Sequence, residues 1–167
     1  MPRITISQKI LRERLPRTQH LTVGPAQIDL MGHMNVGAYG VVFADASREM
    51  TARVGVTEVY VAERRLGAFM LRNFSQFIAE AHEGQVLSVY TRVVARSAKR
   101  YQYMHFMLND TTGLMAATCE VLTTHADLET RRSAPFPPEV IAQIDTFIAD
   151  HNTIDWTEAP LCGLLAP

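Results

Sequence analysis

The chain has 167 residues, of which 47% are hydrophobic. This length suits one domain with a complete core, and it is short for two. Sixteen Lys and Arg residues nearly balance 17 Asp and Glu residues, which gives a formal net charge of −1. That balance argues against a dedicated nucleic-acid-binding protein and against a protein held on an anionic membrane.

Only two cysteines occur, Cys119 and Cys162, and they form neither a CxxC pair nor a zinc-ligand spacing. We therefore expect no disulfide framework, no metal site and a reducing, cytoplasmic location. The first residues lack the apolar core of a signal peptide, and the longest stretch without a formal charge, residues 30–44, is interrupted by glycines. We expect no membrane-spanning segment.

The positive charge is concentrated in arginines. Fourteen of the 16 basic residues are Arg, with clusters at residues 92–100 and 131–132, and no basic residue follows Arg132. Charged runs usually keep a surface solvated, but the planar guanidinium group also binds carboxylate or phosphate oxygens in pairs. Both interpretations are open at this point.

The first part of the chain predicts a strand followed by a helix. Residues 21–28 have a strand pattern, and a turn follows at residues 29–32. Asn35 is a favourable helix N-cap, and apolar residues then recur at three- and four-residue spacing until Gly55, at Tyr39, Val42, Phe43, Ala46, Met50 and Val54. We predict one helix of about five turns. Gly37 and Gly40 in its opening turns cost about 1 kcal/mol each relative to alanine, so we expect a sheet or a ligand to approach closely there.

The rest of the chain predicts a sheet and a final helix. Four segments have strand patterns and are separated by turn residues: 68–78, 86–96, 101–109 and 114–126. In the second of them, one face carries Leu87, Val89, Thr91, Val93 and Ala95, and the other carries Ser88, Tyr90, Arg92 and Arg96. This alternation predicts one buried face and one partly solvent-exposed face. A Pro-rich segment then starts a helix over about 137–151 with an apolar stripe. The order of elements predicts an α+β fold with a helix packed on an antiparallel sheet.

The segment IDLMGHMNVGAY, from Ile28 to Tyr39, and the following Phe43 and Ala46 carry a family resemblance. The segment resembles the signature of hot-dog-fold acyl-CoA thioesterases of the 4-hydroxybenzoyl-CoA thioesterase type, Asp-x-x-Gly-His-x-Asn followed by a spaced Tyr and Phe. The strand order agrees with that family over residues 20–130. The resemblance implies a hot-dog fold, a curved antiparallel sheet wrapped around a long central helix. We expect a single domain over 1–167, with its core at about 18–133 and an extra C-terminal helix.

The same resemblance implies an acyl-CoA thioesterase that works as a homodimer or a dimer of dimers. The family pairs two sheets edge to edge and builds its active sites at the subunit interface. We therefore expect residues 66–78 of one chain to face Asp29 of the other. No metal or redox cofactor is expected, and coenzyme A enters only as part of the substrate.

Asp29 is the residue that we expect to carry the chemistry. It precedes a helix N-terminus whose first N–H groups are unsatisfied and whose dipole favours negative charge. Amides near Val36 can stabilise the oxyanion of a thioester under attack, while Asp29 attacks the carbonyl carbon or activates a water molecule. The resemblance implies the same roles. Considered alone, an Asp before a Gly is often only a turn residue.

The neighbours of Asp29 have expected supporting roles. Gly32 permits a tight turn. His33 orients Asp29 or contacts the thioester, or it only satisfies backbone groups in the turn. Asn35 caps the helix and thereby sets the direction of the polarising amides. Other branches of the family carry His or Tyr at the position of Val36, so only the backbone amide of Val36 can contribute here.

Other candidate groups are less favoured. Glu49 is a rival carboxylate, because another branch uses an acid from the helix, but an ion pair with Arg53 one turn later accounts for it more simply. His125 and Asp127 share one strand face without an evident third metal ligand. No serine has the Gly-x-Ser-x-Gly context of a serine hydrolase.

The arginine clusters fit a coenzyme A substrate, which carries a diphosphate and a 3′-phosphate. Our candidates for these phosphates are Lys99, Arg100, Arg131 and Arg132. Residues 97–100 with His105, and residues 117–120 with His125, are also similar to thioesterases of carnitine and betaine breakdown. That likeness implies a trimethylammonium acyl group, for which Tyr60, Phe69, Tyr101 and Tyr103 are the candidate cation–π partners.

Two alternatives to hydrolysis remain at this stage. One is a hydratase or dehydratase on the same fold, because a fold does not fix the reaction. The other is a non-catalytic acyl-binding module that keeps the motif for structural reasons.

Overall fold

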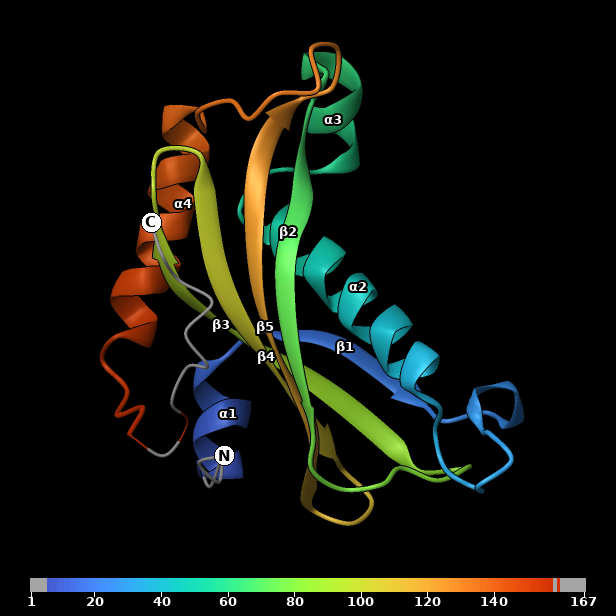
Figure 1. Ribbon diagram of the computed structural model, residues 1–167. Helices are drawn as coiled ribbons and strands as arrows, with labels where there is room; N and C mark the ends of the chain where they lie inside the picture. Colours follow the sequence, from blue (N-terminus) through green and yellow to red (C-terminus); the bar gives the residue numbers. More distant parts are fainter. Residues whose placement is uncertain (1–5, 158, 160–167) are drawn as a thin grey trace.

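The computed structural model describes residues 6–157 and residue 159. The elements in chain order are α1 (Gln8–Arg14), β1 (Arg17–Thr22), a 3-10 turn (Pro25–Gln27), α2 (Val36–Arg53), α3 (Glu58–Arg64), β2 (Leu66–Phe77), β3 (Val86–Arg96), β4 (Arg100–Asn109), β5 (Leu114–Asp127) and α4 (Pro138–His151). The strands form one antiparallel sheet in the order β1-β3-β4-β5-β2. Figure 1 shows the sheet curving beside α2, so the predicted α+β fold is confirmed. None of the helices within the described residues is long and apolar enough to cross a membrane.

Helix α2 begins and ends close to the predicted residues. The side chain of Asn35 accepts a hydrogen bond from the Ala38 amide at 2.8 Å, which confirms its role as N-cap. The helix ends at Arg53, and Gly55 follows with φ +100°. Tyr39, Val42, Phe43, Ala46 and Met50 are buried in the main core. The spacing of these apolar residues therefore orients the helix toward the concave side of the sheet.

The expected close approach at the helix glycines is only partly observed. A Cβ atom on Gly37 would lie 3.2 Å from Asn35 Oδ1, which is tight. A Cβ atom on Gly40 would meet no atom within 4 Å, so no strand among the described residues approaches it. The surface around Gly40 is open to a ligand or to a second protein chain.

The first strand and two short helices differ from the sequence-based expectation. Residues 21–28 were predicted as a strand, but β1 lies earlier, and the 3-10 turn begins at Pro25, which has no N–H to donate to a sheet. Helices α1 and α3 were not predicted. Each is seven residues long, too short for a recognisable helical period.

Of the four residues predicted on the partly exposed face of β3, only Arg96 is partly exposed, with 26% of its side chain accessible. Ser88 and Tyr90 are buried, and Arg92 is only 8% exposed. Helix α1 and the segment that contains Ile154 and Trp156 cover this face and form a second hydrophobic cluster with it. The Arg92 guanidinium lies 4.0 Å from the centre of the Trp156 ring. Burial lowers the pKa of Arg92 to about 10, so the group remains cationic at neutral pH.

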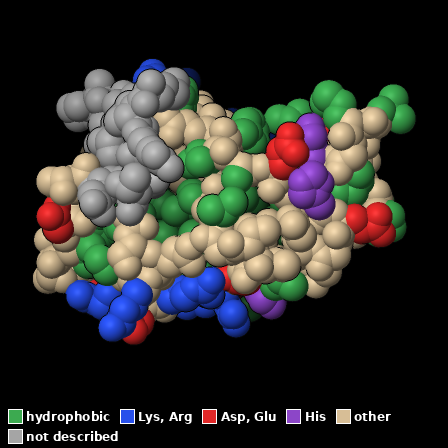
Figure 2. Space-filling view, turned by 90° about the horizontal axis from the view of Figure 1, so that it is seen from below, with side chains coloured by type: hydrophobic (Ala, Val, Ile, Leu, Met, Phe, Trp, Pro, Cys, Tyr) green, Lys and Arg blue, Asp and Glu red, His purple; other side chains and the backbone are tan. Residues whose placement is uncertain are grey.

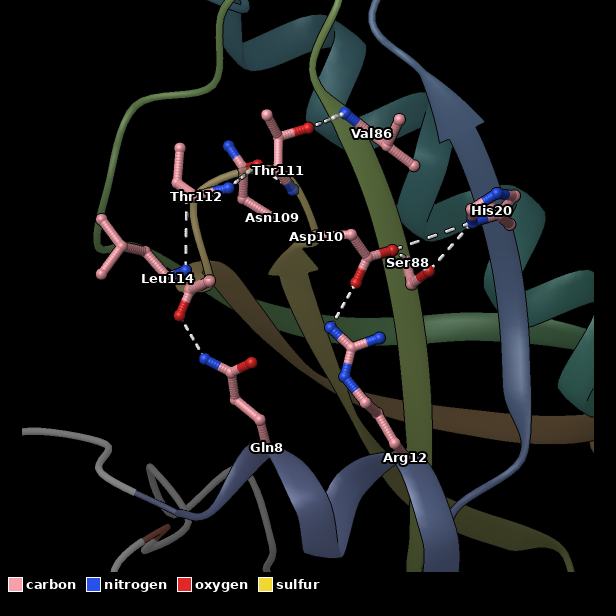
Figure 3. Close-up of polar contacts among 11 residues, drawn as sticks. Gln8, Arg12, His20, Val86, Ser88, Asn109, Asp110, Thr111, Thr112 and Leu114 are labelled. Carbon is pink, nitrogen blue, oxygen red and sulfur yellow. Dashed lines mark hydrogen bonds and ion pairs between the residues drawn. The ribbon is translucent and has the colours of Figure 1, made fainter.

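Polar contacts fasten α1 to the sheet (Figure 3). Arg12 donates to the Asp110 carboxylate at 2.6 Å, and the Ser88 hydroxyl donates to the other oxygen of Asp110 at 2.6 Å. His20 Nδ1 lies 2.9 Å from the Ser88 hydroxyl oxygen. Since the Ser88 proton points to Asp110, His20 Nδ1 is the donor in this pair. These contacts explain why a short helix keeps a fixed position.

Burial of His105 makes the fold sensitive to acid. The His105 ring is fully buried, with the Ser47 hydroxyl 2.9 Å from Nε2 and the Thr91 hydroxyl 2.8 Å from Nδ1. Burial lowers the pKa of His105 from 6.5 to about 3. Between these two values the unfolded chain binds a proton that the folded chain does not. The free energy of unfolding therefore falls as the pH decreases through this window, by at most about 1.4 kcal/mol per pH unit from this group.

Urea unfolding measured from pH 7 to pH 4 checks this expectation. Burial also lowers the pKa of His125 and of His151, so these residues add to the acid sensitivity with the same sign. The variant His105→Gln should show a shallower dependence of stability on pH than the wild type. Equal slopes for the two proteins would contradict the assignment to His105.

Candidate active site

The loop between the 3-10 turn and α2 is a closed turn with Asp29 at its start. An isolated antiparallel bridge joins Ile28 to Met34. The Asp29 amide donates to the His33 carbonyl at 3.0 Å, and the Gly32 amide donates to the Asp29 carbonyl at 3.0 Å. Gly32 has φ +84°, a left-handed conformation that favours glycine. Gly32 of the motif therefore allows the backbone to adopt this turn.

The two oxygens of the Asp29 carboxylate have different surroundings. Oδ1 accepts a hydrogen bond from the Met31 amide at 2.8 Å, which holds the turn. Oδ2 lies 3.7 Å from His33 Nδ1, and the Asp29 side chain is 26% exposed. Asp29 thus has the structural role that its sequence context suggests, and it also presents an oxygen toward solvent beside a histidine.

The N-terminus of α2, at the end of the same loop, offers two backbone donors. Asn35 caps the Ala38 amide, and its own Nδ2 donates to the Gln27 carbonyl at 2.8 Å. The amides of Val36 and Gly37 make no hydrogen bond within the described part of the chain. The Val36 side chain is 70% exposed. The positive end of an 18-residue helix is therefore open at the end of the loop that begins with Asp29.

A small pocket of about 290 Å³ lies against this helix end. Its lining comprises His33, Met34, Val36, Tyr39, Phe77, Ile78, Ala79 and Glu80. The Tyr39 ring meets the Phe77 ring edge to face at 5.1 Å between centres, and burial raises the pKa of Tyr39. Seen from below in Figure 2, hydrophobic, histidine and acidic side chains gather at the right-hand end, where this loop lies in Figure 1.

The structure brings together most of the motif residues and adds a wall that the sequence did not indicate. Asp29, Gly32, His33, Asn35 and Val36 lie in one loop and one helix start. The opposite wall, residues 77–80, comes from the end of β2 and the segment after it. The Met34 amide donates to the Ala81 carbonyl at 2.7 Å, which fixes the two segments to each other. No local sequence pattern marks this wall, although the structure leaves its apolar residues Phe77 and Ile78 exposed.

The basic residues that we predicted for the phosphates lie at the other end of the sheet. In the β2–β5 pairing, Leu66 is opposite Asp127 and Phe77 is opposite Ala117. The Lys99 carbonyl accepts from the His125 amide, and the Arg132 carbonyl accepts from the Asp127 amide, which places both residues near the Leu66 end. The small pocket lies at the Phe77 end. Twelve residues of extended strand span about 36 Å, so one chain does not bring these groups to Asp29.

The less favoured candidates have other partners. Glu49 accepts a hydrogen bond from Arg53 Nε at 2.8 Å, as the sequence spacing predicts. His125 Nδ1 faces the Ala134 carbonyl at 3.1 Å, and its Nε2 lies 2.9 Å from the Tyr60 hydroxyl. Asp127 accepts from two amides of its own turn. Within the described residues no group of three metal-ligating side chains is present. Cys162 lies outside these residues.

The four aromatic residues proposed for a trimethylammonium group do not form one cage. Tyr60 and Tyr101 are buried, and their hydroxyls bond His125 and Thr51. Phe69 is 37% exposed, but the Arg131 guanidinium already lies 5.9 Å from its ring centre. Tyr103 alone borders a large cavity. The expectation of a shared cation–π site therefore fails within one chain.

Curated relatives are named thioesterases. A protein of Pseudomonas aeruginosa named betainyl-CoA thioesterase is 27% identical over 137 residues, which cover 82% of this chain and 86% of that protein. A Rhizobium meliloti protein named L-carnitine dehydrogenase/betainyl-CoA thioesterase is 27% identical over 133 residues. That match covers 80% of this chain and 27% of the longer protein.

Solved structures show the same fold. A Staphylococcus aureus protein solved in complex with CoA superposes with a TM-score of 0.80 at 22% identity, over 92% of this chain and 97% of that chain. A 1,4-dihydroxy-2-naphthoyl-CoA thioesterase from Synechocystis superposes with a TM-score of 0.67 at 17% identity, over 76% and 93% of the two chains. The family model of the thioesterase-like superfamily matches residues 23–144. The chain therefore belongs to the thioesterase-like superfamily, and its fold is the hot-dog fold.

Proposed function

We propose that the protein is an acyl-CoA thioesterase that hydrolyses its substrate to a free acid and coenzyme A. The observation that carries this proposal is the open N-terminus of α2, where Val36 and His33 line the small apolar pocket and the partly exposed Asp29 carboxylate lies beside His33, 3.7 Å from its Nδ1. A thioester carbonyl needs hydrogen-bond donors for its oxygen and a base or nucleophile at its carbon. Membership of the superfamily and the names of the relatives support the same reaction.

In this mechanism the amides of Val36 and Gly37 donate to the thioester oxygen. The dipole of α2 adds positive potential where the oxyanion develops. Asp29 either attacks the carbonyl carbon, which gives a mixed anhydride that water then hydrolyses, or removes a proton from an attacking water molecule. The sulfur leaves as the coenzyme A thiolate in both routes. His33 Nδ1 bonds the Met34 carbonyl at 3.3 Å, which satisfies a backbone group of the turn, and it borders Asp29 Oδ2 at 3.7 Å without a hydrogen bond to it. Only protein groups take part, and no metal or redox cofactor is required.

We also propose that two copies of the chain pair through β2, in a homodimer or a dimer of dimers. This strand is one of the two edges of the sheet, opposite the short β1, and Phe69, Met70, Leu71, Phe77 and Ile78 on and beside it are between 37% and 53% exposed. An exposed apolar edge of 12 residues is a ready template for pairing with another strand. A two-fold axis makes the two β2 strands antiparallel, so the Leu66 end of one copy lies beside the Phe77 end of the other.

Pairing of this kind would bring the basic residues of one copy close to Asp29 of the other copy, although the two groups lie at opposite ends of a single chain. Lys99, Arg100, Arg131 and Arg132 of one copy approach the small pocket of the other copy, where they can bind the phosphates of coenzyme A. Arg131 has φ +58° and Arg65 has φ +55°, and the Leu128 amide donates to the Arg65 carbonyl at 2.9 Å. Left-handed conformations are costly for residues other than glycine and cluster at functional sites, which supports a binding role for this end of the sheet.

Removing the charge of this basic end should weaken binding without slowing the chemistry. The double variant Arg100→Ala and Arg131→Ala is expected to raise KM about 10-fold or more with kcat nearly unchanged, because charge-assisted hydrogen bonds to phosphates hold substrate and transition state equally. Steady-state kinetics of thiol release measures both constants. Arg14→Ala, which removes an exposed charge on α1, is the control and should leave KM unchanged within about twofold. A fall in kcat with constant KM would contradict a phosphate-binding role.

The identity of the acyl group that the protein accepts is tested with a panel of short, medium-length, aromatic and trimethylammonium acyl-CoA esters. The trimethylammonium ester is included because a relative is named betainyl-CoA thioesterase. Release of the thiol from one or more esters supports the proposal. A non-catalytic acyl-binding module would bind these esters without turnover, and that outcome would contradict it.

A further inference from the structure

The turn that carries Asp29 projects into solvent. Leu30 is fully exposed, Met31 is 76% exposed, and Gly32 is also exposed. The Met31 and Gly32 amides both donate to Asp29, so these hydrogen bonds close the turn on itself and do not tie it to the sheet. A carboxylate that attacks a carbonyl carbon or activates water must be held within about 0.5 Å of its productive position. The turn therefore needs support from outside its own residues.

His82, in the segment between β2 and β3, supplies this support. Its Nδ1 lies 3.0 Å from the Gly32 carbonyl oxygen. Since a carbonyl oxygen only accepts, Nδ1 carries a proton and is the donor. Within the described part of the chain, no other group from outside the loop of residues 28–35 hydrogen-bonds residues 29–32. His82 does not line the small pocket, so it contacts the loop and not the space for the substrate.

The backbone that carries His82 is fixed to the sheet. The Gln85 amide donates to the His82 carbonyl at 3.1 Å, and the His82 amide donates to Gln85 Oε1 at 2.9 Å. The Gly84 amide donates to the Val23 carbonyl at 2.8 Å, and the Val23 amide donates to the Gln85 carbonyl at 2.9 Å. Asn109, at the end of β4 (Figure 3), also donates to Gln85 Oε1, at 2.7 Å. The His82 side chain therefore extends from a fixed base to an exposed turn.

The two ring nitrogens of His82 face different groups, which makes their roles separable. Nδ1 faces the Gly32 carbonyl, whereas Nε2 lies 3.5 Å from the Glu80 carboxylate. Glu80 lines the small pocket, so a role of His82 through Nε2 would change the charge beside the pocket and not the position of the turn. The contact at Nδ1 is the shorter of the two, and it is the one that reaches the Asp29 turn.

We propose that His82 is a positioning residue for the reaction and that it acts through Asp29, by holding the Gly32 carbonyl. This inference rests on the proposed function. Without the hydrogen bond from His82, the turn can move and Asp29 spends less time in line with the thioester carbon. The groups proposed for the phosphates of coenzyme A are not affected. The loss of His82 should therefore lower kcat and leave KM nearly unchanged.

Three replacements of His82 test which nitrogen matters. Counted in bonds from Cβ, the amide nitrogen of Asn corresponds to Nδ1 and that of Gln corresponds to Nε2. We expect His82→Asn to keep kcat within about threefold of the wild type, and His82→Ala and His82→Gln to lower it about tenfold. KM should change by less than about twofold in all three. Thiol release from the ester that the wild type hydrolyses best measures both constants.

Two results of this series would overturn the inference. Full activity in His82→Gln with a low kcat in His82→Asn would assign the role to Nε2 and Glu80. Equal kcat values in the three variants, whether high or low, would show that the donor at the Nδ1 position has no special role.

His20→Gln is the matched control. The side chains of His20 and His82 are 51% and 50% exposed, and His20 Nδ1 bonds Ser88 outside the small pocket. This variant should keep kcat and KM within about twofold of the wild type, and thermal unfolding should show that all variants are folded. A tenfold loss of kcat in folded His20→Gln would contradict a role specific to His82.

A double-mutant cycle tests whether His82 acts through Asp29. In the Asp29→Asn background, His82→Ala should lower the residual kcat by less than about twofold, because the carboxylate that His82 positions is already absent. A further tenfold loss would overturn the positioning role. Failure of the wild type to hydrolyse any ester would instead overturn the proposed function, so the two failures are distinguishable.

Discussion

Replacing Asp29 with Asn should lower kcat by about 10²- to 10⁴-fold, because the amide neither attacks a carbonyl carbon nor accepts a proton from water. The expected change in KM is small, since Asp29 is not assigned to the phosphates or to the acyl group. Asn keeps an oxygen that can accept from the Met31 amide, the contact that holds the turn. The variant should therefore fold like the wild type, and thermal unfolding measured beside the kinetics checks this point.

The matched comparison is Glu49→Gln, which neutralises the rival carboxylate on α2. Glu49 is paired with Arg53 on the helix surface and lies far along α2 from the free amides. Its loss should reduce kcat by less than about tenfold, since an exposed ion pair contributes little. A large loss in Glu49→Gln together with full activity in folded Asp29→Asn would reverse the assignment of the two carboxylates.

A positive charge in the middle of β2 should separate the two copies and abolish most of the activity. Leu71 is 45% exposed and lies near the centre of the strand, next to Arg72, so a two-fold axis brings the central residues of both copies together. Leu71→Lys places like charges there, and an interface cannot accommodate unpaired charges without a large desolvation penalty. We expect a monomer in light scattering and a fall in kcat/KM of about tenfold or more.

Val59→Lys provides the control for this variant, since Val59 is an exposed apolar residue on α3 outside β2. It should leave the dimer and the activity intact. Full activity in a monomeric Leu71→Lys protein would mean that one chain holds a complete site. The role proposed for the basic end of the second copy would then be wrong.

The parts of the fold that follow local rules were predictable. Asn35 and the apolar spacing behind it located α2, and the alternation in residues 86–126 located three strands nearly to the residue. The covering of the outer face of β3 was not predictable, because it depends on Trp156 and α1, which are distant in sequence and carry no periodic signal. Short helices such as α3 form through tertiary packing more than through their own propensity.

In the candidate site too, the residues of a local motif were predictable and the contacts between distant segments were not. The loop residues Asp29 to Val36 form a recognisable motif, and their spacing alone places a carboxylate before a helix N-terminus. The wall at residues 77–80 depends on the register of β2 against β5, which no local pattern encodes. The distance between Arg100 and Asp29 likewise depends on strand direction. Charge identified the basic residues, but only the sheet shows that they lie at the opposite end and require a second copy.

The central claim is hydrolysis of a thioester, and its most direct test is the initial rate of thiol release from octanoyl-CoA and the other esters of the panel. The matching α,β-unsaturated octenoyl-CoA is supplied in parallel, and its hydration is followed by loss of the enoyl absorbance. We predict thiol release by the wild type, its loss in Asp29→Asn, and no hydration of the double bond. Hydration of the enoyl ester without thiol release from any substrate would contradict the account and identify the protein as a hydratase on this fold.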